Sequence, residues 1–134
     1  MEKQGNWELK TYEVPGRRIV WTEGIGQANP EEVNKVTEYV LAKAKSFGPG
    51  AWAYIPGIDK MAPIFDSETQ KCFADMHKKC EEAGCVAFAF ASGGMAAIKV
   101  QSKRHHQQSH VGIVSEHFRT ADDAKEWLKE NFGI

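Results

Sequence analysis

The chain has 134 residues, enough for one domain with a buried core and too few for two ordinary domains, so we expect a single domain over residues 1–134. Seventeen basic and eighteen acidic residues give a net charge of −1, which lacks the basic excess that nucleic-acid binding needs. The first ten residues are too polar for a signal peptide, and no apolar run approaches the roughly 20 residues that span a bilayer. These features predict a cytoplasmic protein with no nucleic-acid partner and no membrane span.

The chain begins with a predicted hairpin followed by a helix. Residues 6–14 and 17–24 alternate polar and apolar side chains, and Pro15-Gly16 between them is typical of a tight turn. Asn29 before Pro30 then indicates a helix start, with Asn as the N-cap and Pro in the first turn. The apolar residues that follow at helical spacing are Val33, Val36, Val40, Ala44 and Phe47.

The middle of the chain predicts strand, helix and strand. Residues 51–58 are short, aromatic and closed by Pro-Gly, as in a strand that enters a loop. A second helix carries Cys72 and Cys80 on its apolar side, with His77 expected on the solvent side. Residues 85–91 are apolar throughout, which is typical of a strand covered on both faces. The odd number of cysteines favours reduced thiols in the core.

The remaining elements complete an alternating order. We expect a third helix over residues 95–108, a strand within residues 110–118, and a last helix capped by Thr120. The predicted order is therefore ββαβαβαβα. It indicates an α/β domain with a five-stranded, mixed and mostly parallel sheet flanked by four helices.

This order and two stretches of sequence resemble the STAS domain superfamily, which includes the anti-sigma-factor antagonists, the SpoIIAA-like proteins and the STAS/SEC14 group. The stretches are AYIPGIDKMAPIFDSETQKCFADMHKKCEEAGCVAFAF and FRTADDAKEWL, and the likeness extends from about Trp7 to Phe132. It implies a SpoIIAA-like fold. The sequence looks most like the SpoIIAA-like and STAS/SEC14 branch, in which binding of a small apolar or lipid-like ligand is sometimes inferred.

The resemblance also assigns a role to an Asp-Ser pair. In the antagonists, the serine of that pair is phosphorylated by a partner kinase, and by position this serine is Ser67, next to Asp66. The residues themselves offer another role, because Ser67-Glu68-Thr69-Gln70 has the form of a capping box in which Ser67 is the N-cap. Ser67 is thus a candidate phosphoacceptor and a candidate cap, and one role does not exclude the other.

Aromatic and apolar residues form a second candidate site. Core packing is the ordinary role of such side chains, but Trp21, Tyr54, Met61 and Phe65 can also line an apolar ligand pocket. The loop from Ile58 to Phe65, which includes Ile64, is unusually apolar for a surface loop. We expect it to fold over the core or to meet a partner, and an exposed apolar loop would favour a homodimer.

Catalytic and metal-binding patterns are weak. His106 and His110 lie one turn apart if their segment is helical, but no carboxylate or cysteine in that segment completes a metal site. No established catalytic motif occurs. We therefore expect a protein that is not an enzyme and has no cofactor. Its expected function is that of a regulatory or protein-interaction domain with an anti-sigma-factor-like kinase or another protein as partner. The alternative is a carrier or sensor of a small apolar ligand, and an enzyme that uses His106 or His110 comes third.

Overall fold

A five-stranded sheet with the strand order β1-β2-β3-β4-β5 organises the protein. The structure is a computed structural model that describes residues 7–64, 66–93 and 112–134. The first two strands pair antiparallel, and every later pair is parallel. The strands are β1 (Glu8–Tyr12), β2 (Ile19–Gly26), β3 (Trp52–Met61), β4 (Cys85–Ala91) and β5 (Val114–Phe118). The predicted α/β domain with a mixed, mostly parallel sheet is confirmed.

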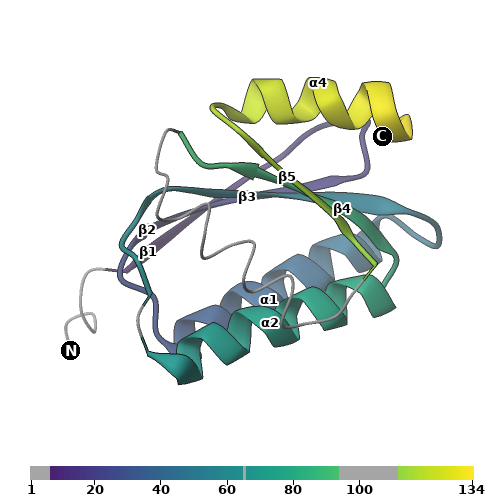
Figure 1. The fold of residues 1–134 in the computed structure, drawn as a ribbon. Helices are drawn as coiled ribbons and strands as arrows, with labels where there is room; N and C mark the ends of the chain where they lie inside the picture. The colour runs from purple at the N-terminus through teal and green to yellow at the C-terminus, as the bar shows by residue number, and fades with distance from the viewer. Residues whose placement is uncertain (1–6, 65, 94–111) are drawn as a thin grey trace.

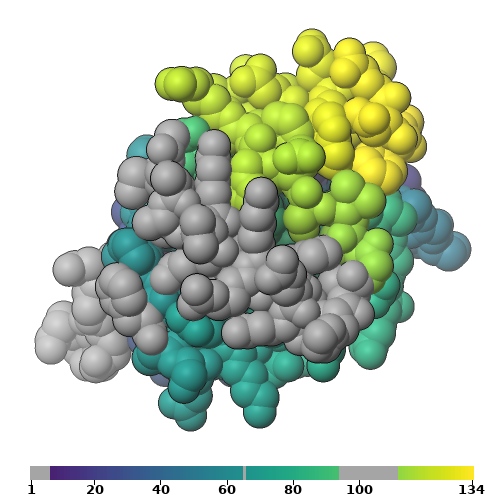
Figure 2. Space-filling model, in the orientation of Figure 1, coloured from purple at the N-terminus to yellow at the C-terminus, as the bar shows by residue number. Residues whose placement is uncertain are grey.

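Helices cover both faces of this sheet (Figure 1). The helices α1 (Pro30–Ser46) and α2 (Ser67–Glu82) pack on one face, and α4 (Ala121–Phe132) packs on the other. In the space-filling view, α4 forms the top of the molecule, and teal atoms of the α2 region form the opposite end (Figure 2). The predicted helix over residues 95–108 lies outside the described residues. No helix in the described ranges is both long and apolar enough to cross a membrane.

The strand β4, which lies between β3 and β5, is buried on both faces, as its apolar sequence predicts. Phe88 and Phe90 belong to the core on the α1 and α2 side, whereas Ala87 and Ala89 belong to the core under α4. All four side chains are buried. The small alanine side chains let α4 lie close to the sheet, and the phenylalanines fill the deeper layer beneath α1 and α2.

Two helix starts are confirmed in detail. The side chain of Asn29 accepts a hydrogen bond from the backbone N–H of Glu32 at 2.9 Å. The hydroxyl of Thr120 accepts one from the N–H of Asp123 at 3.2 Å. Both contacts satisfy a backbone donor that the helix itself leaves unpaired.

The C-terminal end of α1 depends on a residue that is distant in sequence. The guanidinium of Arg18 donates hydrogen bonds to the carbonyls of Phe47 at 2.6 Å, Gly48 at 2.8 Å and Ala51 at 2.7 Å. All three carbonyls lie beyond Ser46, in the connection from α1 to β3, so the guanidinium satisfies acceptors of this connection and its charge complements the dipole at this end of the helix. The glycines at positions 48 and 50 predict the end of the helix from the sequence, but nothing in the sequence predicts that Arg18 stabilises it.

The strand β3 is longer than predicted. Residues 58–61 belong to it, so only residues 62–66 connect β3 to α2. Pro56 and Gly57 suggest an end because they interrupt most strands. The strand continues because β2 runs to Gly26 and pairs with Lys60 and Met61 after a register shift near Glu23. The predicted loop from Ile58 to Phe65 is therefore wrong in its first half.

Candidate functional site

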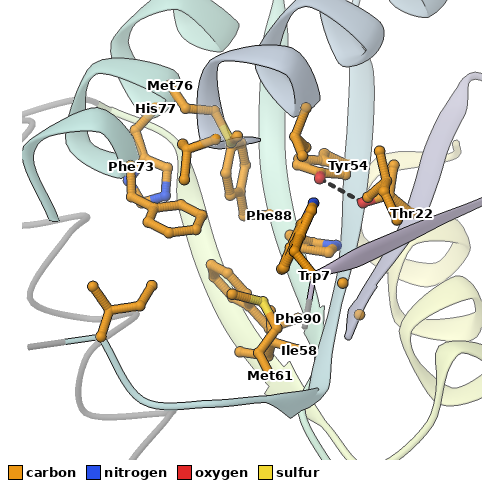
Figure 3. A pocket seen from close by; sticks show the side chains of 17 residues that line it. Trp7, Thr22, Tyr54, Ile58, Met61, Phe73, Met76, His77, Phe88 and Phe90 are labelled. Atoms are coloured by element: carbon orange, nitrogen blue, oxygen red, sulfur yellow. Dashed lines mark hydrogen bonds between the residues drawn. The ribbon is translucent and has the colours of Figure 1, made fainter. Parts of the chain in front are cut away.

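An apolar cavity lies between the sheet and the helices α1 and α2 (Figure 3). Its volume is about 60 Å³. The sheet contributes residues from β1 to β4, whereas α1 contributes Val33 and Val36, and α2 contributes Phe73, Met76 and His77. No Asp, Glu, Lys or Arg side chain lines it within the described part of the chain.

Two glycines shape the sheet side of this cavity. A Cβ atom at Gly24 would lie 2.5 Å from the Cη2 atom of Trp7, so only glycine lets the Trp7 ring lie against β2. A Cβ atom at Gly57 would lie 3.0 Å from the backbone carbonyl oxygen of Thr22. Both glycines line the cavity. Each position requires glycine because a larger side chain would collide with the residues around it.

A group of aromatic rings forms the deepest wall. Phe88 is 1% exposed, and its ring packs edge-to-face against Tyr54 and His77, with centroid distances of 5.2 and 4.5 Å. The ring centroid of Phe90 lies 5.8 Å from that of Phe88, so Phe90 extends this aromatic wall. Edge-to-face pairs place the positive edge of one ring against the negative face of another, which fixes the rings more firmly than area burial alone.

One hydrogen-bonded pair of hydroxyls interrupts the apolar lining. The Oγ1 atom of Thr22 and the phenolic oxygen of Tyr54 are 2.7 Å apart, and both side chains are buried (Figure 3). Burial raises the pKa of Tyr54 far above its ordinary value, so the phenol stays neutral throughout the physiological range. The pair thus places neutral hydrogen-bonding groups in an apolar cavity.

The structure brings together most of the predicted pocket residues. Tyr54, Met61 and Ile64 line the cavity, as the ligand-pocket alternative expects. Phe65 lies outside the described residues. The prediction for Trp21 is wrong, because side chains alternate along β2, and Trp21 belongs to the opposite face from Thr22.

Trp21 has a different set of contacts. Its ring stacks on Tyr12 with a centroid distance of 4.3 Å, and the Nζ atom of Lys125 from α4 lies 4.1 Å from its centroid. This arrangement is a cation–π contact on the α4 side of the sheet. Trp21 therefore helps to hold α4 against the sheet.

The apolar segment before α2 folds over the core. Met61 is 7% exposed and Ile64 is 3% exposed, so neither contributes to an exposed apolar surface. Of the two expectations for this segment, Met61 and Ile64 meet the first, which is folding over the core. The expectation of a homodimer depended on an exposed apolar loop, so these buried residues give it no support.

The start of α2 corrects the expected capping box. The N-cap is Asp66, whose carboxylate accepts hydrogen bonds from the N–H of Thr69 at 2.9 Å and from its hydroxyl at 2.6 Å. Gln70 instead donates its side-chain N–H to the carbonyl of Ile64. Thr69 is fully buried, and one carboxylate oxygen of Asp66 accepts from both of its donors, so neither is left unsatisfied.

Electrostatics keep Asp66 in this role. The hydroxyl and the N–H of Thr69 hold the pKa of Asp66 below its ordinary value, because both hydrogen bonds favour the charged carboxylate. Ser67 follows as the first helical residue, and its side chain is exposed. The cap and the candidate phosphoacceptor are therefore two different residues.

The thiols belong to the core rather than to a reactive site. Cys80 and Cys85 are buried, and Cys72 is half-buried. Burial raises the pKa of all three thiols, to about 12 for Cys80. They are therefore protonated at neutral pH and poor nucleophiles. Within the described ranges, no group of three His, Cys, Asp or Glu side chains could hold a metal ion. His106 and His110 lie outside those ranges.

Sequence reasoning missed several cavity residues. Trp7 and Phe90 line the cavity, and His77, expected on the solvent side, is only 3% exposed and faces Phe88. The pattern of α2 carries a signal for His77, because it follows the buried Met76 and stands three residues before the buried Cys80. The neighbouring lysines at 78 and 79 obscure that signal.

Comparisons with known proteins identify the class of fold. No family model and no curated protein sequence matches the chain. Among solved structures it is similar to an uncharacterized protein of the DUF3478 family with a SpoIIAA-like fold, from Shewanella loihica PV-4. The match covers 96% of this chain and 98% of that chain, with a TM-score of 0.65 and 10% sequence identity. At this identity the likeness shows the fold alone, and it confirms the predicted SpoIIAA-like fold.

Proposed function

We propose that the protein is a non-catalytic carrier or sensor that binds a small apolar ligand between the sheet and the helices α1 and α2. One observation carries this proposal. The core contains a cavity of about 60 Å³ whose lining is apolar apart from the side chains of Thr22, Tyr54 and His77 and the indole N–H of Trp7. Protein cores are otherwise packed with few voids larger than a water molecule.

The energetics of an apolar void favour a ligand. An empty cavity of this volume costs about 1 to 2 kcal/mol at roughly 24 cal/mol per Å³. A ligand that fills it restores dispersion contacts and removes apolar surface from water. The volume is well below the roughly 300 Å³ of sites for drug-sized ligands, so we infer a ligand, or an inserted part of one, of only a few carbon atoms.

Cyclopentane is a suitable probe, and filling the cavity should prevent its binding. We expect cyclopentane to shift amide resonances of the wild-type protein in a saturable manner. Val36→Ile adds a methylene group to the lining of the cavity, which should weaken binding about tenfold or more because overpacking costs about 1 to 3 kcal/mol. The measurement is a titration followed by two-dimensional amide NMR spectra.

Val86→Ile is the matched control. Val86 is half-buried and packs on the α4 side of the sheet, so the same change there should leave the affinity for cyclopentane unaltered. The proposal is contradicted if the wild-type protein shows no saturable shifts, or if Val36→Ile and Val86→Ile bind equally well.

A second proposal concerns regulation at Ser67. The observation that favours it is the cap by Asp66, which leaves the exposed Ser67 hydroxyl without a capping role. Ser67 is the first residue of α2, so a phosphate on its hydroxyl would interact favourably with the helix dipole. The partner would then be a kinase of the anti-sigma-factor type. Phosphosite mapping of the protein from its native host should find modified Ser67, and recovery of only unmodified Ser67 across growth conditions speaks against the switch.

A further inference from the structure

The buried hydroxyl pair leaves one hydrogen unused, and this deepens the ligand-binding proposal on which it rests. Thr22 and Tyr54 each carry one O–H group, so together they have two donor hydrogens. The contact of 2.7 Å between their oxygens uses one of them, whichever residue donates. No other hydrogen bond joins either hydroxyl to the described residues, so the second hydrogen has no acceptor there.

A buried donor without an acceptor is costly in an apolar setting. Thr22 and Tyr54 are each 2% exposed, so bulk water does not reach them. Leaving a buried O–H unsatisfied forfeits its hydrogen bond to water without replacing it. Both residues line the cavity, so an acceptor atom on a bound molecule can reach this donor.

The surroundings also select against charge. In the described residues, the side chains that line the cavity include no Asp, Glu, Lys or Arg that could pair with an ion. Burying an unpaired ion costs far more than burying a neutral dipole. A neutral acceptor, by contrast, needs only the one hydrogen that the pair offers.

We infer that the natural ligand is an uncharged apolar molecule with one hydrogen-bond acceptor, such as a ketone, ester or ether oxygen, and that the Thr22–Tyr54 hydroxyl pair donates to this oxygen. Thr22 and Tyr54 are therefore the residues that determine specificity, while Val36, Met61 and Phe88 supply apolar contact. This assignment predicts a preference within a series of small ligands of similar size.

The test compares cyclopentane, cyclopentanone and butyrate by NMR titration of the full chain. We expect cyclopentanone to bind roughly fivefold more tightly than cyclopentane, as one neutral hydrogen bond allows, and butyrate to bind more weakly than either. In the double variant Thr22→Val with Tyr54→Phe, both hydroxyls are replaced by groups of similar shape, which keeps the cavity apolar without leaving an orphaned partner. This variant should lose the preference for cyclopentanone over cyclopentane.

The outcomes separate this inference from the proposed function. If the wild-type protein binds cyclopentane but shows no preference for cyclopentanone, or if it prefers butyrate, the specificity assignment fails while the apolar site stands. If the preference persists in the double variant, the hydroxyl pair is not its origin and the assignment fails. If neither neutral probe binds the wild-type protein, both proposals fail. If the double variant does not fold, the order of affinities of the wild-type protein for cyclopentanone, cyclopentane and butyrate still decides the assignment, because either single variant would leave one donor hydrogen in the cavity.

Discussion

Replacing Phe88 with alanine should cost about 3 to 5 kcal/mol of unfolding free energy, the range for deletion of a buried aromatic side chain. Phe88 is 1% exposed and contacts the rings of Tyr54, His77 and Phe90, so its loss removes the centre of the aromatic wall. Urea unfolding followed by circular dichroism measures the change. Phe88→Leu should show a smaller loss in the same direction, because much of the apolar volume remains.

The void left by Phe88→Ala adjoins the existing cavity, which allows a ligand to reverse part of the damage. Benzene should restore roughly 1 kcal/mol or more to this variant, because a ligand that binds only the folded state stabilises it. Phe118→Ala is the control, since Phe118 is half-buried on the α4 side and does not line the cavity. Equal rescue of both variants by benzene would show that the effect does not come from the cavity.

Replacing Leu128 with alanine should also cost about 2 to 5 kcal/mol, the usual range for a buried leucine. Leu128 is 0% exposed and lies in the core beneath α4. That core occupies the face of the sheet opposite to the cavity. The affinity for cyclopentane, measured below the unfolding transition, should therefore stay the same.

Leu41→Ala calibrates this result. Leu41 is only half-buried on α1, so its truncation should cost less than that of Leu128. A large loss of cyclopentane affinity in Leu128→Ala, with the protein still folded, would contradict the assignment of the cavity to the α1 and α2 side.

Local signals account for the features that the sequence predicts well. The caps at Asn29 and Thr120 depend on residues within three positions of each other, and both occur as expected. The strand β4 is recognisable because its apolar run is complete and short enough for a strand. The turn at Pro15 and Gly16 is confirmed by a positive φ of 76° at Gly16.

Features that depend on pairing between distant segments are harder to predict. The face that Trp21 occupies is set by the register of β2 against β3, and a shift of one residue would reverse it. The continuation of β3 beyond Gly57 depends on the length of β2. Trp7 enters the cavity because Gly24 lies opposite its ring, a relation that no local pattern contains.

The cap of α2 illustrates a competition between two local signals. Both Asp66 and Ser67 are favourable N-cap residues. Gln70 would complete a capping box with Ser67, whereas Thr69 can donate hydrogen bonds to Asp66. Burial decides between them, because the hydroxyl of the fully buried Thr69 obtains its partner from Asp66. Burial is a property of the whole fold, so the sequence alone leaves the position of the cap open by one residue.

The location of a bound probe tests the proposed ligand site most directly. Methyl-labelled protein saturated with cyclopentane should show nuclear Overhauser contacts from the ligand to the methyl groups of Ile58 and Ile64, which line the cavity. It should show none to Ile19 and Ile55, which are also buried but lie on the opposite face of the sheet. Contacts to Ile19 or Ile55, or no contacts to any of the four, would contradict an apolar ligand site between the sheet and the helices α1 and α2.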